Sequence, residues 1–198
     1  MYLYGASGHA KVIIDILRNV GIAVTGLFDD NPDLKELGGI KVLGKFIQDH
    51  ELEEPLIISI GDNRIRARIA QQLQVTYGRA IDKSVILSPS ATVGEGTVVM
   101  QGAILQAEVQ VGRHAIINTG AKIDHECVIG DFAHVSPGAV LCGNVSVGEG
   151  TWVGAGAVVI PGVKIGKWCQ IGAGAVVIRD VPDNAVAVGN PCKIIKYC

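Results

Sequence analysis

The sequence predicts a chain in two parts, an α/β N-terminal domain with a small Rossmann-like parallel sheet and then a left-handed parallel β-helix. An aliphatic residue stands at every sixth position from Leu87 to Val177, which is fifteen steps of six without an exception. The chain holds 26 glycines but only three phenylalanines, which predicts many tight turns around an aliphatic core. Before residue 80, strand-like and helix-like segments alternate instead. We therefore expect domains of residues 1–80 and 81–198.

Composition excludes several classes of function. With 198 residues and 48% hydrophobic content the chain can build a proper core, and its net charge of -2 without a basic run argues against nucleic acid as a partner. The N-terminus lacks the basic region and cleavage site of a signal peptide, and no apolar run is long enough to span a bilayer. We expect a cytoplasmic protein without membrane insertion. Five cysteines without a CxxC pair predict neither a disulfide framework nor a zinc knuckle.

The first domain is expected to contain three strands and two helices. The strands are residues 1–5, 24–30 and 56–63, each rich in aliphatic or aromatic side chains. Residues 6–20 have the amphipathic pattern of a helix that ends near Gly21, and residues 64–73 form the second helix. This alternation is typical of a small parallel sheet.

The glycine-rich segment Gly5–His9 lies at the first strand-to-helix turn, where backbone N–H groups and the helix dipole favour a phosphate. Asp29 and Asp30 follow the second strand, a common place for a carboxylate that meets a ribose. The segment lacks the middle glycine of the dinucleotide fingerprint, and a tight turn that needs glycine only for packing is an alternative. About 80 residues are few for two mononucleotide halves. A nucleotide-sugar diphosphate fits better than NAD.

The period of six fits a short strand followed by a corner, three of which close a triangular coil. Each aliphatic residue points into the prism and glycine helps make the turns. Coils stacked at about 4.8 Å give a column roughly 25 Å tall. Such hexapeptide prisms wind left-handedly, an exception to the usual crossover rule. The tail from residue 181 leaves the repeat and is expected to fold back along the prism.

The segment IDHECVIGDFAHV, residues 123–135, places polar residues on this prism. Because Ile123 and Ile129 occupy interior positions, His125 falls at a corner between small residues one coil away on either side. Those two neighbours are Ala107 and Gly143. A neighbouring corner column is equally slim and could line, with the first, a groove for a long thin ligand such as pantetheine. That column consists of Thr119, Pro137, Ala155 and Ala173.

His125 is the candidate general base. Glu126 follows it directly and could hold one ring nitrogen, which fixes the tautomer and raises basicity, while Asp124 is a competing partner. His134 has no adjacent carboxylate and suits a donor to a ligand carbonyl, and Asn118 could position an acceptor.

Zinc is the rival interpretation of the three prism histidines, because the gamma-class carbonic anhydrases also hold zinc on a β-helix. The spacings from His114 to His125 and from His125 to His134 do not match the close pair of those enzymes. We therefore expect no metal, and a plain surface position for His114.

Several segments together carry a resemblance over the whole chain: YGASGHAKVIIDIL, LFDDN, ISIGDNRIR, SPSATVG, NTGAKIDHECVIGDFAHVSPGAVLCGNV and VGNPCKIIK. They resemble the sugar O-acyltransferase and sialic-acid O-acetyltransferase-like proteins. The chain is especially similar to the N-acetyltransferases of bacterial bacillosamine synthesis, which acetylate a UDP-4-amino-4,6-dideoxy sugar. The resemblance implies a homotrimer with sites between adjacent prisms, acetyl-CoA along the coils and the nucleotide-linked amino sugar on the N-terminal domain.

Site residues carried over by this resemblance fall into three groups. His125 would be the general base and Glu126 would orient it. The acetyl-CoA side would comprise His134 near the thioester, with Gly143, Ala155 and Ala173 along the groove; the family varies at the two alanines. The nucleotide-sugar side would comprise Ser7, Gly8, His9, Asp29, Asp30, Gly61, Asn63, Arg64 and Asn118.

The implied reaction is direct attack of a neutral sugar amine on the thioester, with His125 accepting its proton and a backbone N–H, such as that of Gly143, stabilising the oxyanion. Cys127 and Cys142 are expected to be core thiols, so no acyl-enzyme forms. O-acetylation of sialic acid or another sugar hydroxyl remains an alternative, since the same base could serve. A non-catalytic or zinc-dependent β-helix is a third.

Overall fold

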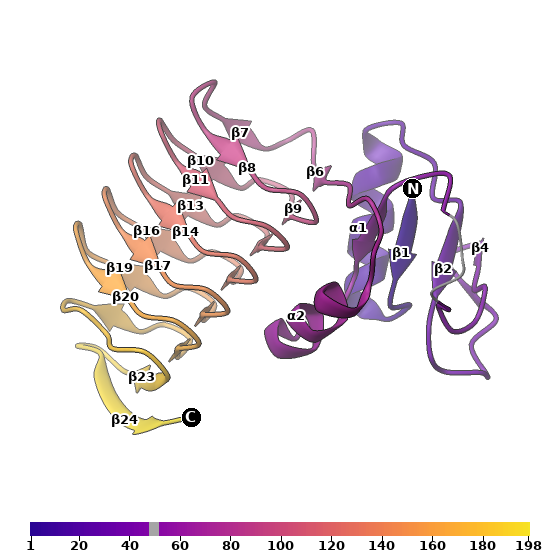
Figure 1. Ribbon diagram of the computed structural model, residues 1–198. Helices are drawn as coiled ribbons and strands as arrows, with labels where there is room; N and C mark the ends of the chain where they lie inside the picture. Colours follow the sequence, from indigo (N-terminus) through magenta and orange to yellow (C-terminus); the bar gives the residue numbers. More distant parts are fainter. Residues whose placement is uncertain (48–51) are drawn as a thin grey trace.

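The computed structural model describes residues 1–47 and 52–198, and it shows an α/β unit beside a long prism of stacked coils (Figure 1). In the α/β unit, three parallel strands pair in the order β2-β1-β5. They are β1 (Tyr2–Tyr4), β2 (Gly26–Phe28) and β5 (Leu56–Ile58). Leu3 pairs with Leu27 on one side and Ile57 on the other, and all three side chains are fully buried.

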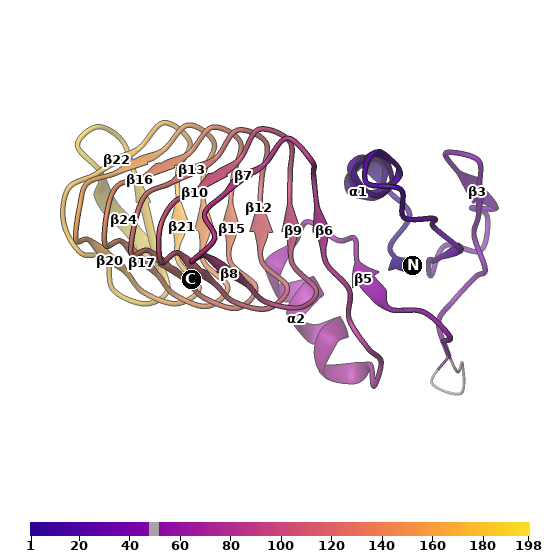
Figure 2. The same cartoon turned by 90° about the horizontal axis from the view of Figure 1, so that it is seen from above.

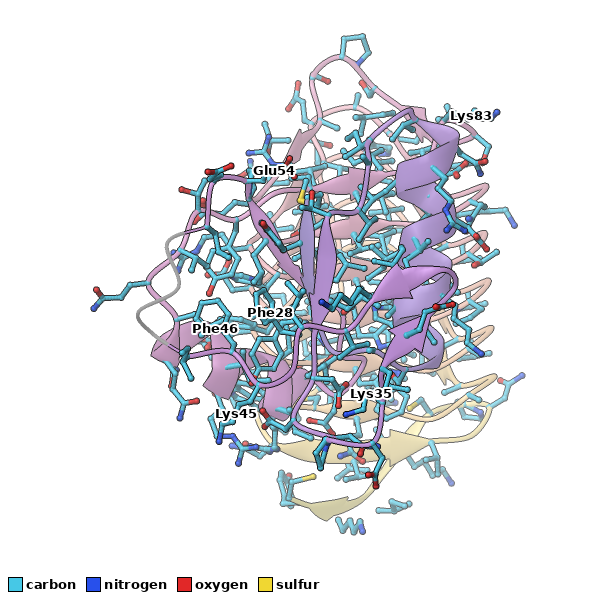
Figure 3. The ribbon with its side chains drawn as sticks, turned by 90° about the vertical axis from the view of Figure 1, so that its right-hand side faces the viewer. Phe28, Lys35, Lys45, Phe46, Glu54 and Lys83 are labelled. Atoms are coloured by element: carbon cyan, nitrogen blue, oxygen red, sulfur yellow. The ribbon has the colours of Figure 1, made fainter. Side chains whose placement is uncertain are left out.

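Two helices and a hairpin complete this unit. Helix α1 (Gly8–Asn19) follows β1, α2 (Asn63–Gln72) follows β5, and β3 (Glu36–Leu37) pairs with β4 (Ile40–Lys41). Phe28 and Phe46 lie together beside the sheet, with ring centroids 5.0 Å apart at an edge-to-face angle of 80° (Figure 3). Aromatic rings prefer this arrangement to a face-to-face sandwich.

The prism has three faces of parallel two-residue strands, each named here after its first strand. The β6 face contains β6 (Ala80–Ile81), β9 (Val98–Val99), β12 (Ile116–Ile117), β15 (His134–Val135), β18 (Trp152–Val153) and β21 (Gln170–Ile171). The β7 face contains β7 (Ile86–Leu87), β10 (Ile104–Leu105), β13 (Lys122–Ile123), β16 (Val140–Leu141), β19 (Val158–Val159) and β22 (Val176–Val177). The β8 face contains β8 (Thr92–Val93), β11 (Gln110–Val111), β14 (Val128–Ile129), β17 (Ser146–Val147) and β20 (Lys164–Ile165).

The predicted repeat is confirmed in its register. Leu105 pairs with Ile123 and Ile123 with Leu141, so each coil advances the chain by eighteen residues. These aliphatic side chains fill the interior and are fully buried. Leu87 is an exception at 39% exposed, because β7 is the edge strand of its face and no coil stacks beyond it. Figure 2 shows the coils as successive loops along one axis.

The two parts share a core. Helix α1 lies against the β6 face, where its buried aliphatic side chains form one cluster with Val98, Met100 and Ile116. At the other end of the prism, β23 (Ala185–Val188) pairs parallel with β21, and β24 (Lys193–Tyr197) runs back antiparallel to β23. Among the described residues, neither helix has the length and apolarity needed to cross a membrane.

Candidate active site

His125 lies at the corner between β13 and β14, which joins the β7 and β8 faces. Its Nδ1 is 2.9 Å from Glu126 Oε2, and both side chains are more than half exposed. Asp124, the competing partner, instead accepts the backbone N–H of His125 at 2.8 Å. Because the carboxylate of Glu126 can only accept, Nδ1 carries a proton and Nε2 is the atom available to take one from a ligand.

Gly143 lies directly beside the His125 ring, one coil further along. A Cβ placed on Gly143 would be 2.6 Å from both Cε1 and Nε2 of the imidazole, well inside van der Waals contact. Among the described residues the Gly143 N–H has no hydrogen-bond acceptor, whereas the Gly143 carbonyl accepts the Gly162 N–H. The corner therefore offers a base and a free backbone donor side by side.

His134 occupies a different environment, on β15 in the β6 face. Its Nε2 is 3.0 Å from the Asn118 amide nitrogen, and its ring stacks on Trp152 with centroids 5.8 Å apart. Burial, with the positive charge of Arg66 and the proximity of His9, lowers the pKa of His134 to about 3. His134 is therefore neutral at physiological pH.

The glycine-rich turn begins α1 with unused donors. Ser7 is the N-cap, yet its side chain makes no capping hydrogen bond, and both Ser7 and Gly8 are exposed. The amides of the first helical turn lack partners within a helix, which makes this end favourable for an anion. His9, in that first turn, has a buried Nε2 without a hydrogen-bond partner among the described residues, and burial lowers its pKa to about 4.

Asp29 braces the glycine-rich turn. One carboxylate oxygen accepts the Ala6 N–H at 2.8 Å and the other accepts the Asn31 N–H at 2.9 Å. Asp30 is exposed, with the Tyr4 hydroxyl 3.5 Å away. Both carboxylates line a hollow in the α/β unit, together with Tyr4, Gly5, Ile60, Ile65, Arg68, Ile69 and Gln72.

Helix α2 contacts the prism through Asn63 and Arg64, which the resemblance assigns to the nucleotide-sugar side. Asn63 donates its amide to the Gly150 carbonyl at 3.1 Å, and the Arg64 guanidinium lies 4.9 Å from the Trp168 ring centroid. Such a cation–π contact is worth about 0.5–1 kcal/mol at an exposed site. Gly61, just before the helix, contributes its carbonyl to Arg66. The side chains of Asn63 and Arg64 therefore face the coils of the prism.

Arg66 is the principal residue that sequence reasoning missed. It is 1% exposed and donates to the carbonyls of His114 and Phe132 on the prism, at 2.8 and 2.9 Å, and to Ile60, Gly61 and Asn63 on its own unit. Desolvation lowers its pKa to about 10, so it remains charged. The sequence contains only a weak signal for its burial. Arg66 lies on the same face of α2 as Ile69, and this face packs inward.

The expectation of a surface position for His114 was wrong. The side chain is 4% exposed because Tyr77 meets it edge-on at 4.4 Å and Phe132 stacks on it at 5.2 Å. Burial lowers its pKa to about 4. Among residues 1–47 and 52–198, no group of histidine, cysteine and carboxylate side chains is arranged to hold a metal ion.

One chain does not bring all candidate residues together. His125, Glu126 and Gly143 lie at the corner opposite the β6 face, which carries His134 and Asn118 beside the α/β unit. Ala155 and Ala173 are exposed at a third place, the corner between the β6 and β7 faces. The base and the buried histidine thus lie on opposite sides of the same prism.

One known protein family matches the α/β unit of this chain and another matches part of the prism. Residues 1–73 match the PglD N-terminal domain, and residues 144–179 match the bacterial transferase hexapeptide (six repeats). An uncharacterized protein of Acanthamoeba polyphaga mimivirus is 37% identical over 101 residues, half of this chain and 21% of that protein. The match therefore spans about a fifth of the length of that curated relative.

Several solved structures match along nearly the whole chain, and the following are two of them. A variant of perosamine N-acetyltransferase from Caulobacter crescentus, in complex with CoA and GDP-perosamine, is 40% identical with a TM-score of 0.93, covering 98% of this chain and 96% of that one. The acetyltransferase domain of PglB from Neisseria gonorrhoeae, in complex with acetyl coenzyme A, is 32% identical with a TM-score of 0.88, covering 98% of each chain. The chain belongs to the family of hexapeptide-repeat sugar acetyltransferases that carry a PglD-type N-terminal domain.

Proposed function

We propose that this protein transfers the acetyl group of acetyl-CoA to the 4-amino group of a UDP-linked 4-amino-4,6-dideoxy sugar, with His125 as general base. The single observation that carries the proposal is the exposed corner where the His125 ring lies against Gly143 with Glu126 on its Nδ1. This corner supplies a proton acceptor and a free N–H donor at one place. Relatives in complex with CoA or acetyl coenzyme A support the donor.

The proposed step needs no covalent enzyme intermediate. The neutral amine attacks the thioester carbonyl, a C–N bond forms, and His125 Nε2 takes the proton that the nitrogen loses. The carbonyl oxygen becomes negative and accepts a hydrogen bond from the Gly143 N–H. As the C–S bond breaks, the imidazolium returns its proton to the CoA sulfur. Cys127 is buried, and burial raises the pKa of its thiol, which disfavours a nucleophilic role.

The nucleotide is assigned to residues 1–80 and acetyl-CoA to residues 81–198. Ser7, Gly8 and His9 would hold the diphosphate at the start of α1, where the helix dipole and free N–H groups favour negative charge. The hollow that Asp30 lines is the proposed place of the nucleoside, with Asp29 holding its wall. Asn63 and Arg64, bound to the prism, would shape the side of the site between the two units.

Assembly as a homotrimer would complete the site. His125 and His134 lie on opposite sides of one prism, so a site that uses both draws them from adjacent copies. Gly143, Ala155 and Ala173 would then line the pantetheine groove between two prisms. The β7 face offers a partly apolar surface for such packing, with Ile86 61% exposed and a hollow that Ile104 and Val140 line together with Lys122 and Asp124.

O-acetylation is the alternative, because the same base could activate a sugar hydroxyl. The decisive experiment measures CoA thiol release with a UDP-4-amino-4,6-dideoxy sugar, its 4-hydroxy counterpart, GDP-perosamine and free sialic acid. We expect release with an amino sugar alone and its loss in His125→Ala. Release with only a hydroxyl acceptor would refute N-acetylation, and undiminished turnover in His125→Ala would refute the role of the base.

A further inference from the structure

The contact between Asn118 and His134 determines which ring nitrogen carries the proton. Asn118 follows β12 and His134 lies on β15, the neighbouring strand of the β6 face (Figure 2). The Thr119 N–H donates to Asn118 Oδ1 at 2.8 Å, so the amide nitrogen is the atom that faces the ring, 3.0 Å from Nε2. An amide nitrogen can only donate. Nε2 must therefore accept, which leaves the proton on Nδ1.

The plane of the ring is fixed as well. Trp152, one coil further along, lies parallel to the imidazole within 3°. The indole is itself held by a hydrogen bond of 2.6 Å from its Nε1 to Ser136 Oγ. His134 is thus clamped at one edge by an amide and on one face by an anchored ring.

The surroundings also keep His134 uncharged. The described residues place no carboxylate in hydrogen-bond or ion-pair contact with it, whereas Glu126 contacts His125. The buried Arg66 cation lies on the same side of the prism, and burial together with that charge holds the pKa of His134 far below its ordinary value. A neutral imidazole in a fixed tautomer can donate a hydrogen bond without titrating, a device known from other enzymes.

We propose that Asn118 is a positioning residue, which acts through His134 and not on the substrate, and that it makes His134 a fixed neutral Nδ1–H donor. The acceptor is an oxygen of the bound ligand that gains negative charge during acyl transfer, namely the thioester carbonyl oxygen. This assignment rests on the proposed acetyl transfer. The two histidines then have different roles. His125, beside the Glu126 carboxylate, transfers a proton, whereas His134, beside the Asn118 amide, keeps the proton on its Nδ1.

The tautomer can be measured without any substrate. The full-length protein is labelled with 13C and 15N in histidine, the His134 signals are assigned by their loss in His134→Gln, and the ring shifts are followed from pH 5 to 8. We expect a neutral Nδ1–H ring throughout. In Asn118→Asp the carboxylate can only accept, so Nε2 should become protonated. An Nε2–H ring in the wild type would overturn the proposal.

Kinetics then separates positioning from direct contact. Asn118→Asp should lower kcat on the order of 100-fold, as expected for a lost oxyanion donor, with little change in the KM for the nucleotide sugar. Asn184→Asp, the same change at an exposed corner of the same prism, is the matched control and should leave kcat and the His134 shifts unchanged. Lost turnover in Asn118→Asp with an unaltered His134 tautomer would show direct substrate contact and refute positioning. Correct tautomers without transfer to any amine would refute the proposed function alone.

Discussion

Replacing Gly143 by alanine tests the geometry of the base most directly. The new methyl group would lie 2.6 Å from Nε2 and Cε1 of His125, whereas ordinary contact begins near 3.4 Å. The ring must therefore move by roughly 1 Å, and a displacement of that size costs about 100-fold in rate at an active site. Alanine keeps the backbone N–H, and the conformation of Gly143 is not left-handed, so neither the donor nor the coil is lost.

The assay is a double-mutant cycle on the initial rate of CoA release. It compares wild type, Gly143→Ala, His125→Ala and the double variant. We expect kcat of Gly143→Ala to fall about 100-fold, with its Tm close to wild type because the displaced ring is 55% exposed. In the His125→Ala background the same substitution should have almost no further effect. Wild-type turnover in Gly143→Ala, or an undiminished effect in the double variant, would refute the account of the corner.

Three further results are expected. Glu126→Gln should lower kcat about tenfold because the His125 ring loses its charged partner. Asp124→Asn keeps an acceptor for the backbone N–H of His125 and should leave kcat unchanged, so equal losses in the two variants would contradict the role of Glu126. Arg66→Met should lower the free energy of unfolding in urea by about 3 kcal/mol, since several buried carbonyls lose their donor. Arg66→Lys should recover part of this free energy, and an unchanged urea midpoint in Arg66→Met would contradict the buried contacts. The free energy of unfolding should fall as the pH drops from 6.5 to about 4, because His9, His114 and His134, with folded pKa values of about 4, 4 and 3, bind protons in this range only when unfolded. In His114→Phe the slope should be smaller by about 1.4 kcal/mol per pH unit, and an identical slope would contradict the burial of a neutral His114 ring.

The prism could be predicted from the sequence because every coil obeys the same rule. An aliphatic residue at each sixth position fixes the interior, and the corners follow from it, so the corner position of His125 needed no tertiary information. The neighbourhood of Gly143 and His125 followed from the same eighteen-residue register. Local pattern and global fold agree throughout this half of the chain.

The contacts between the two units could not be predicted in this way. Arg64, Arg66 and Arg68 alternate along α2, and nothing in that pattern says that only Arg66 is buried. His114 lies at a corner like His125, yet Tyr77 from the other unit covers it. Which corner becomes exposed depends on where the α/β unit packs, and that is a property of the whole chain.

Helix α2 contacts four consecutive levels of the prism. Arg66 binds the carbonyls of His114 and Phe132, Asn63 binds Gly150 and Arg64 covers Trp168, so each level is eighteen residues from the next. These contacts fix the number of coils between residues 114 and 168. Insertion or deletion of a whole coil in this range would move some of the contact residues away from α2, although the repeat of the prism itself would tolerate the change. Coils beyond residue 170 have no such contacts with α2, and length variation among relatives should concentrate there.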